Sequence, residues 1–189
     1  KYDIGLHSIV VYSKKYELFA IEVNHKLGKT EKTAERLQAI LGKSKVIVQN
    51  GLSLSISKIN DPKEFISKLR ESYAIKQLRA TFSRPNPFDA DEKFQKPSAE
   101  MLQAVNGNEG STVFKGANLD QEAVEAISRS TVATGNIARA RILTKQNSHL
   151  STISTEGDPY TLTYDKEDVK PSKVYKDMIR VYKEIWNGE

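Results

Sequence analysis

The chain has 189 residues, of which 38% are hydrophobic and 28% are charged, so its length and composition are typical of one globular domain. The absence of cysteine excludes disulfide bonds, thiolate zinc sites and cysteine nucleophiles, and it favours a reducing, cytoplasmic location. No apolar run approaches the roughly 18 residues that indicate a membrane span, so we expect no membrane partner.

The net charge of +5 is unevenly distributed along the chain. Residues 1–59 hold ten Lys and Arg against five Asp and Glu, whereas the two kinds of charge balance in residues 60–120 and in residues 121–189. A basic balance suits phosphate-rich partners, because each neutralised phosphate releases counterions. A net charge of this size serves solubility equally well, so it does not decide between the two interpretations.

The first part of the chain alternates β-rich and helical patterns. Two β-prone runs at residues 4–13 and 16–25, separated by two lysines, predict a hairpin. Residues 29–42 carry an apolar stripe with helical spacing and end in glycine, which predicts a helix. Residues 45–59 contain an Asn-Gly pair between β-prone segments, which predicts a second hairpin.

The middle of the chain begins with a proline that suits the first turn of a helix. Asp61 and Pro62 therefore predict a short helix that runs through Leu69, and a strand follows at residues 78–83. Two prolines in the sequence RPNP, residues 84–87, end that strand, because proline cannot donate a ladder hydrogen bond. One face of the strand is apolar, and the expected inward residues are Leu78, Ala80 and Phe82.

The segment 89–110 has an acidic start, a helical stretch and a glycine-rich end, and we expect it to be a surface excursion. Asp120 is then suited to cap a helix that Gly135 would end. Strands are predicted at residues 137–146 and 148–154.

The C-terminal part begins with a turn and a further predicted strand within residues 157–164. Residues 170–188 are the clearest helix of the chain, because apolar side chains recur on one stripe. The stripe consists of Tyr175, Met178, Tyr182 and Ile185.

The order hairpin, helix, hairpin, helix at the start of the chain predicts an α+β fold, mainly an antiparallel sheet with helices packed on one face. We expect residues 1–189 to form a single domain, or two closely packed subdomains divided near residues 89–110.

The common catalytic motifs are missing from this sequence. It has no GxxxxGK[ST] phosphate loop, no GxGxxG turn, no HExxH helix and no GxSxG elbow, and its three histidines stand alone. We therefore assign no catalytic residue, no metal ligand and no cofactor. Carboxylates such as Glu22 and Asp165, or the acidic groups around Asp91 and in residues 165–168, leave a metal-dependent nuclease as the third and weakest hypothesis.

A long segment without carboxylates provides the strongest functional signal. No Asp or Glu occurs between Glu125 and Glu156, although this segment contains several cations. On a strand with a period of two, Arg139, Arg141 and Lys145 would share one face and would repel each other unless an anion or a distant carboxylate compensates them.

Other cations extend this pattern. Arg129 lies in the same acid-free segment, and Lys43 and Lys45 lie in a second one between Glu35 and Asp61. Arg79 and Arg84 would join the basic surface if their strand lies beside the Arg139 strand. In the alternative, Arg79 pairs with Glu64 or Glu71 of the preceding helix.

The RPNP strand end at residues 84–87, followed by a long helix with a Gly-Asn break at residues 135–136, resembles poorly characterised bacterial and phage proteins associated with phage defence. Some of these proteins bind DNA. The resemblance implies DNA association in a prokaryotic cytoplasm, and it transfers no catalytic residue.

The sequence thus predicts a module that binds nucleic acid, with DNA as the expected partner, through basic contacts to the phosphate backbone. The expected binding residues are Arg139, Arg141, Lys145, Arg129, Arg79, Arg84, Lys43 and Lys45. The alternative is a protein-interaction or assembly domain, in which the C-terminal helix docks onto a protein partner or a second copy of the chain.

Overall fold

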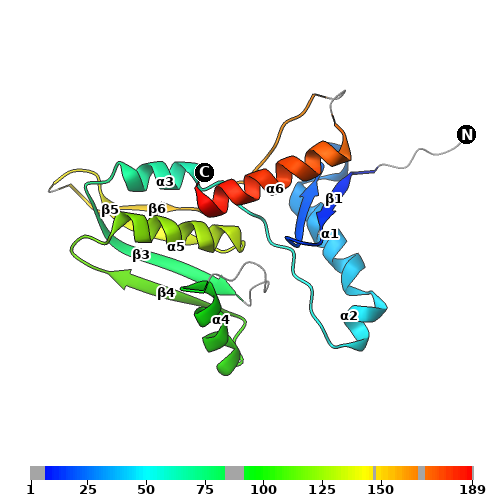
Figure 1. Ribbon diagram of the computed structural model, residues 1–189, viewed down its shortest axis with the longest axis horizontal. Coiled ribbons are helices and arrows are strands. Elements are labelled where there is room, and N and C mark those ends of the chain that lie inside the picture. The colour runs from blue at the N-terminus through cyan, green and yellow to red at the C-terminus, as the bar shows by residue number, and fades with distance from the viewer. Residues whose placement is uncertain (1–6, 84–91, 147, 166–168, 189) are drawn as a thin grey trace, which may run out of the picture. The chain divides into compact units, whose positions relative to one another are not determined.

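The computed structural model describes residues 7–83, 92–146, 148–165 and 169–188 (Figure 1). The chain divides into two compact units, of which the first comprises residues 1–58 and 165–178 and the second comprises residues 59–164 and 179–189. Helices combine with two antiparallel sheets, which confirms the predicted α+β class. The described part of the segment 89–110, residues 92–110, lies within the second unit.

The first unit contains a two-stranded sheet followed by helices. Strands β1 (Val10–Ser13) and β2 (Leu18–Ile21) pair antiparallel, which confirms the N-terminal hairpin. Tyr12 and Phe19 are cross-strand partners, and their rings stack with centroids 4.6 Å apart. The 3-10 helix η1 (His25–Leu27), helix α1 (Thr30–Gly42) and helix α2 (Lys45–Gln49) follow.

The prediction of a second hairpin in residues 45–59 is wrong, because helix α2 occupies the first part and no strand occurs in the second. Asn50 and Gly51 end this helix instead of turning a hairpin. The Asn50 side-chain amide donates to the Val46 carbonyl oxygen at 2.8 Å, and Gly51 has a φ of 61°. An Asn-Gly pair suits a helix C-terminus as well as a hairpin turn, because both need backbone with positive φ.

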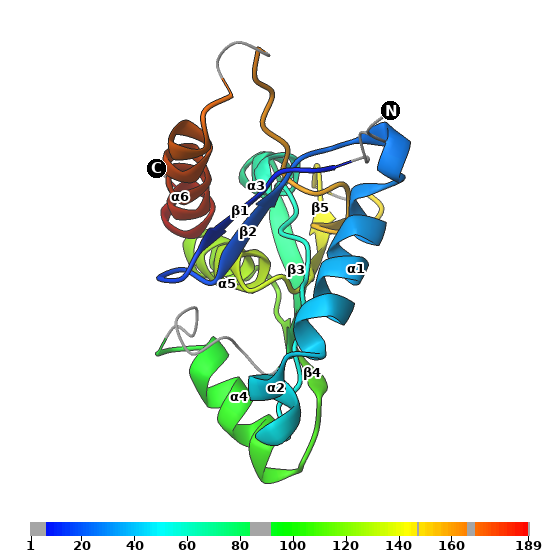
Figure 2. The ribbon, with the colours of Figure 1, turned by 90° about the vertical axis from the view of Figure 1, so that its right-hand side faces the viewer.

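The second unit contains a four-stranded antiparallel sheet with the strand order β4-β3-β5-β6 (Figures 1 and 2). Its strands are β3 (Ala74–Ser83), β4 (Glu109–Lys115), β5 (Ala138–Leu143) and β6 (Ser151–Ser154). Its helices are α3 (Lys63–Arg70), α4 (Gln95–Ala104) and α5 (Gln121–Ala133). The strand predicted within residues 157–164 does not form, and only an isolated bridge joins Pro159 to Asn60.

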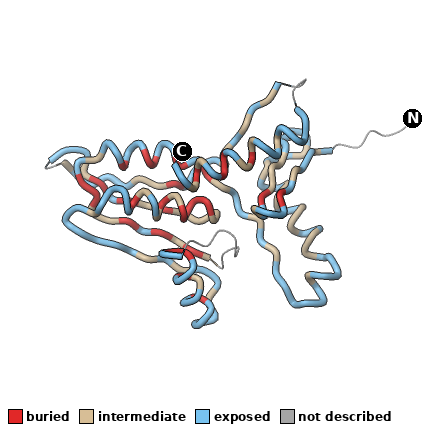
Figure 3. The backbone as a smooth tube through the Cα atoms, in the orientation of Figure 1, coloured by how far each residue is buried: buried red, intermediate tan, exposed pale blue. Residues whose placement is uncertain are grey.

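The core of the second unit lies between the helices and one face of the sheet. Burial alternates along β3. Leu78, Ala80 and Phe82 are buried as predicted, whereas Arg79 between them is exposed. Buried segments of the helices and strands of the second unit are drawn red in Figure 3. The main core cluster unites α3, β3, α5 and β5, and its members are Phe65, Ile66, Leu69, Ile75, Leu78, Val124, Ala138, Ala140 and Ile142. Helix α4 adds Leu102, which packs in a smaller cluster with Ala80 and Phe82.

Residues at the ends of the helices that cover this face explain where these helices begin and end. The Asp120 carboxylate accepts a hydrogen bond from the Ala123 N–H at 2.8 Å, which confirms the predicted cap of α5. Gly135 follows the helix with a φ of 73°, a conformation that a residue with a Cβ seldom adopts. The predicted short helix forms as α3, and its apolar residues Phe65, Ile66 and Leu69 are all buried.

Helix α6 (Pro171–Asn187) contributes residues to both units. Its predicted apolar stripe is mostly buried, since Met178, Tyr182 and Ile185 are between 4% and 8% exposed, while Tyr175 is 39% exposed. Within the described ranges, no helix is long and apolar enough to cross a bilayer.

We predict that Leu78→Ala lowers the free energy of unfolding by about 2–5 kcal/mol, because Leu78 is completely buried and its truncation leaves a cavity in the core. Urea denaturation followed by circular dichroism measures the change. Val105→Ala is the matched control, since Val105 is 77% exposed, and its effect should stay within about 0.5 kcal/mol. Equal effects of the two substitutions would contradict the assigned core.

Candidate functional site

Three arginines gather on the face of the sheet opposite to the core. In an antiparallel pair, residues directly opposite each other project to the same face, and Arg79 of β3 is directly opposite Arg139 of β5. Arg141 lies two residues further along β5 and therefore shares this face. We call the surface formed by Arg79, Arg139 and Arg141 the arginine face.

The arginine face is open and lined by hydroxyl groups. Arg79 and Arg141 are exposed, and the Arg139 side chain is 41% exposed. The neighbouring strands bring polar residues beside them, because Ser154 is opposite Arg139 and Thr152 is opposite Arg141. The Arg79 guanidinium donates to the Ser111 hydroxyl at 3.2 Å. The cations are thus surrounded by groups that can also bind an anion.

Carboxylates compensate this face only in part. Arg139 forms an ion pair with Glu156, which lies two residues after the end of β6. Neither Arg79 nor Arg141 has a carboxylate within ion-pair distance in the part of the chain that the structure describes. The alternative pairing of Arg79 with Glu64 or Glu71 is not found among the described residues, since Glu64 binds Lys68 and Glu71 accepts a hydrogen bond from the Ser67 hydroxyl at 2.7 Å. Two of the three guanidinium groups therefore lack a carboxylate partner within the described residues.

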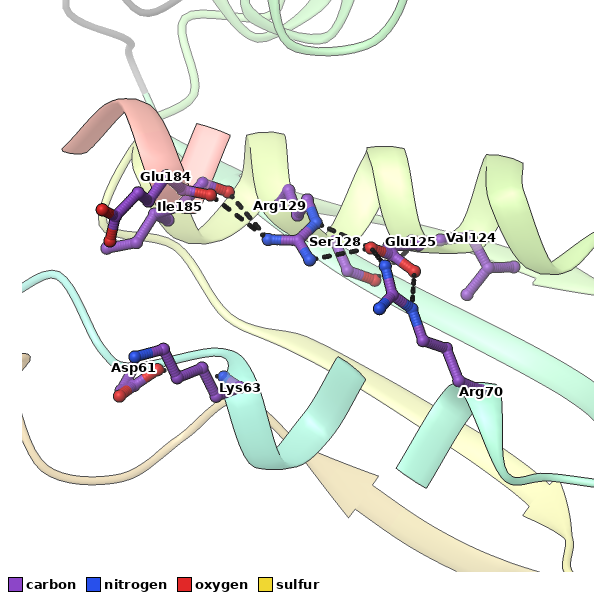
Figure 4. Close-up of polar contacts among 9 residues, drawn as sticks. All are labelled: Asp61, Lys63, Arg70, Val124, Glu125, Ser128, Arg129, Glu184 and Ile185. Carbon is purple, nitrogen blue, oxygen red and sulfur yellow. Dashed lines mark hydrogen bonds and ion pairs between the residues drawn. The ribbon is translucent and has the colours of Figure 1, made fainter. Parts of the chain in front are cut away.

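Arg129 occupies a different environment, on helix α5 (Figure 4). Its guanidinium binds the Glu125 carboxylate at 2.7 Å and donates to the Glu184 and Ile185 carbonyl oxygens in the last turn of α6 at 3.5 and 3.3 Å. The side chain is only 13% exposed. A cation at this position satisfies free carbonyl groups and the negative end of the helix dipole, so its contacts fasten two helices together.

Glu125 is the centre of this network, because it binds Arg70 as well as Arg129 (Figure 4). Burial alone would raise the pKa of the Glu125 carboxyl, but the hydrogen bonds and positive charges of Arg70 and Arg129 outweigh burial and lower it. The carboxylate is consequently ionised at neutral pH and forms ion pairs with both arginines.

The remaining predicted binding residues lie elsewhere. The prediction that Lys145 shares a strand face with Arg141 is wrong, because β5 ends at Leu143 and Lys145 is exposed in the bend that follows. Lys43 and Lys45 are exposed and belong to the first unit. Arg84 lies outside the described residues, as does the whole RPNP segment.

Sequence reasoning missed the polar neighbours and the carboxylate of this face. Ser111, Thr152 and Ser154 come from two other strands, and their positions depend on a register that no local pattern reveals. Glu156 is the residue at which the acid-free segment ends, so its nearness in space to Arg139 could have been suspected from the predicted strand pair.

The described carboxylates that were considered for a nuclease do not form a metal site. Glu22 accepts a hydrogen bond from the Ile9 N–H at 2.8 Å, and Glu92 pairs with Lys96 at 3.0 Å. Across the described ranges, no group of three His, Cys, Asp or Glu side chains is arranged to hold a metal ion. Asp91 and residues 166–168 lie outside these ranges.

Comparisons with known proteins give no match: no family model fits the chain, and no curated protein sequence and no solved structure shows significant similarity to it. The arginine face therefore has to be interpreted from its own chemistry.

We predict that Glu125→Gln lowers the free energy of unfolding at neutral pH by about 1–3 kcal/mol, because it removes a charge that two arginines bind. Since folding lowers the Glu125 pKa, its stabilisation is present above the ordinary value of 4.5 and is lost as the pH falls through the folded pKa. The difference between the two proteins should therefore narrow from neutral pH to pH ~3.

Urea denaturation at a series of pH values measures this difference. Glu100→Gln is the control, because Glu100 is exposed on α4 and forms no ion pair with a described residue. A gap between Glu125→Gln and the unmodified protein that stays constant down to acidic pH would refute the electrostatic role of this carboxylate.

Proposed function

We propose that this protein binds DNA through its arginine face, by contacts to the phosphate backbone. The observation that supports the proposal is the direct opposition of Arg79 and Arg139 on neighbouring strands, with Arg141 on the same face. Like charges directly opposite each other destabilise a sheet. An anion on this face would relieve that repulsion, and a guanidinium group can bind two phosphate oxygens at once.

The chemistry of the face favours backbone contacts over base recognition. The side chains that accompany the arginines on this face come from Gln, Thr, Ser, Val, Leu and Lys residues and from one carboxylate, Glu109, and no aromatic residue shares their parity within the described strands. Single-stranded nucleic acids usually bind where bases stack on exposed rings. We therefore propose duplex DNA as the ligand and binding that is largely independent of sequence.

The proposal also fixes the expected strength and salt dependence. Three arginines neutralise at most about three phosphates, so the slope of log affinity against log salt should be close to about −3. Affinity should lie in the range of non-specific complexes, roughly 10⁻⁴ to 10⁻⁶ M at physiological salt.

The assembly hypothesis, which depends on the C-terminal helix, has less support. The apolar side chains that would dock onto a partner include Met178, Tyr182 and Ile185, and all three are buried within the chain itself. A helix offers a docking face only where its apolar side chains are exposed.

We predict that the double variant Arg79→Gln with Arg141→Gln weakens binding to a mixed-sequence DNA duplex at least tenfold at low salt, because it removes the two cations without a carboxylate partner. It should also reduce the salt slope by about 1.8. Fluorescence anisotropy with a labelled duplex over a series of salt concentrations measures both quantities.

The matched control is Lys68→Gln with Lys96→Gln, which removes the same net charge from helices α3 and α4. Both lysines are exposed and pair with a glutamate four residues before them. The control should change affinity only slightly. If both double variants weaken binding equally, attraction comes from the overall charge and the arginine face is not the site.

A further inference from the structure

Strand β4 is one edge of the sheet, and its outer side has no partner strand among the described residues. The Thr81 N–H of β3 donates to the Ile137 carbonyl oxygen, on the side of β5. Since alternate residues of a strand bond to opposite sides, Ala80 and Phe82 bond toward β4. Their partners on β4 are Thr112 and Gly110, so the odd-numbered residues of β4 direct their backbone N–H and C=O groups outward.

This edge lacks the usual protection against pairing with another strand. It is seven residues long, contains no proline, and exposes the apolar side chains of Val113 and Phe114, which are 44% and 37% accessible. Its only charges are at its two ends, where Glu109 is negative and Lys115 is positive. Neither forms an ion pair with any residue that the structure describes.

The sequence EGSTVFK is complementary to itself in the antiparallel direction. When two copies align about a two-fold axis at Thr112, Glu109 of one copy is opposite Lys115 of the other at both ends of the ladder. Ser111 is then opposite Val113, and Gly110 is opposite Phe114. The outward backbone groups of odd-numbered residues meet odd-numbered residues, so this register also satisfies the hydrogen-bond pattern.

We propose that the β4 strands of two copies of this protein pair antiparallel, with Thr112 opposite Thr112, and join the two sheets into one of eight strands. Charge complementarity at both ends selects a second copy as the occupant of this edge. Registers shifted by two residues would keep the hydrogen bonds but would separate Glu109 from Lys115.

The pairing has a consequence for the arginine face, and this consequence alone rests on the proposed function. A two-fold axis between antiparallel edge strands is perpendicular to the sheet, so the arginine faces of both copies lie on the same side. One duplex could then contact both faces, and the linked contacts would raise affinity without any new interaction within a copy.

The absence of cysteine permits a direct test of the register. Thr112→Cys introduces a single thiol, and Cα atoms of opposite residues outside the hydrogen-bonded pairs are about 4.5 Å apart, within disulfide range. Ser111→Cys is the control, because Ser111 would be diagonal to its own copy, about 7–8 Å away. Mild oxidation should give a covalent dimer with Thr112→Cys and little with Ser111→Cys.

Ser111 is more exposed than Thr112, so random collisions between copies would cross-link the control variant Ser111→Cys faster than Thr112→Cys. Equal cross-linking of the two variants, or faster cross-linking of Ser111→Cys, would overturn the proposed register.

Charge reversal tests the pairing in the reversible dimer. Glu109→Lys alone and Lys115→Glu alone should each raise the dissociation constant roughly tenfold or more, because two like-charged pairs replace two ion pairs. The double variant, which exchanges the two charges, should restore dimerisation. Sedimentation analysis over a wide concentration range, without DNA, measures the three proteins.

A chain that stays monomeric at every concentration, or a double variant that dimerises no better than either single variant, would overturn the proposal. If the β4 edge instead binds an extended peptide from another protein, Glu109→Lys and Lys115→Glu would have unequal effects on association. That result would also overturn the proposed pairing of two β4 strands. If the dimer forms while the Arg79 and Arg141 variant binds DNA normally, the proposed function fails and the dimer remains.

Discussion

The one-sided sheet of the second unit determines where Arg79, Arg139 and Arg141 lie. Burial of Leu78, Ala80 and Phe82 against the helices fixes which face of β3 is turned inward. A slip of one residue would expose these side chains and bury Arg79, at a large cost in hydrophobic and desolvation free energy. The position of Arg79 is therefore a consequence of core packing, and Ala138, Ala140 and Ile142 place the β5 arginines in the same way.

How far the sequence predicts this structure depends on whether the signal is local. The parity of β3, the inner stripe of α3 and the cap at Asp120 were predictable, since each rests on neighbours within a few residues. The opposition of Arg79 and Arg139 was not, because it joins strands 60 residues apart and depends on a register shift between Ile75 and Gln77. The false hairpin at residues 45–59 has the same cause, because an Asn-Gly pair predicts a turn only if its flanking strands find partners.

The acid-free segment was an informative pattern, but it overstated the number of free cations. Arg129 and Arg139 both lie inside it, and each pairs with one of the two carboxylates at its ends, Glu125 and Glu156. A helix brings together residues four apart, and a strand pair brings together residues equally distant from its connection. A segment without acidic residues thus predicts an uncompensated cation only where the cation is not brought close to the carboxylates at the two ends of the segment. Arg141 is such a cation, since it pairs with neither Glu125 nor Glu156.

The same strand parity links the arginine face to the β4 edge. Glu109 and Lys115 project to the side of the arginines, so an unpaired Glu109 would partly offset the positive potential of that face. In a β4 pair, Glu109 and Lys115 neutralise each other, and the charge of the joined surface is set by the arginines together with Glu156, which pairs with Arg139. If the arginine face binds DNA as proposed, about three phosphate contacts per copy would give only weak binding, and an arrangement that doubles the contacts on one side would raise affinity at physiological salt.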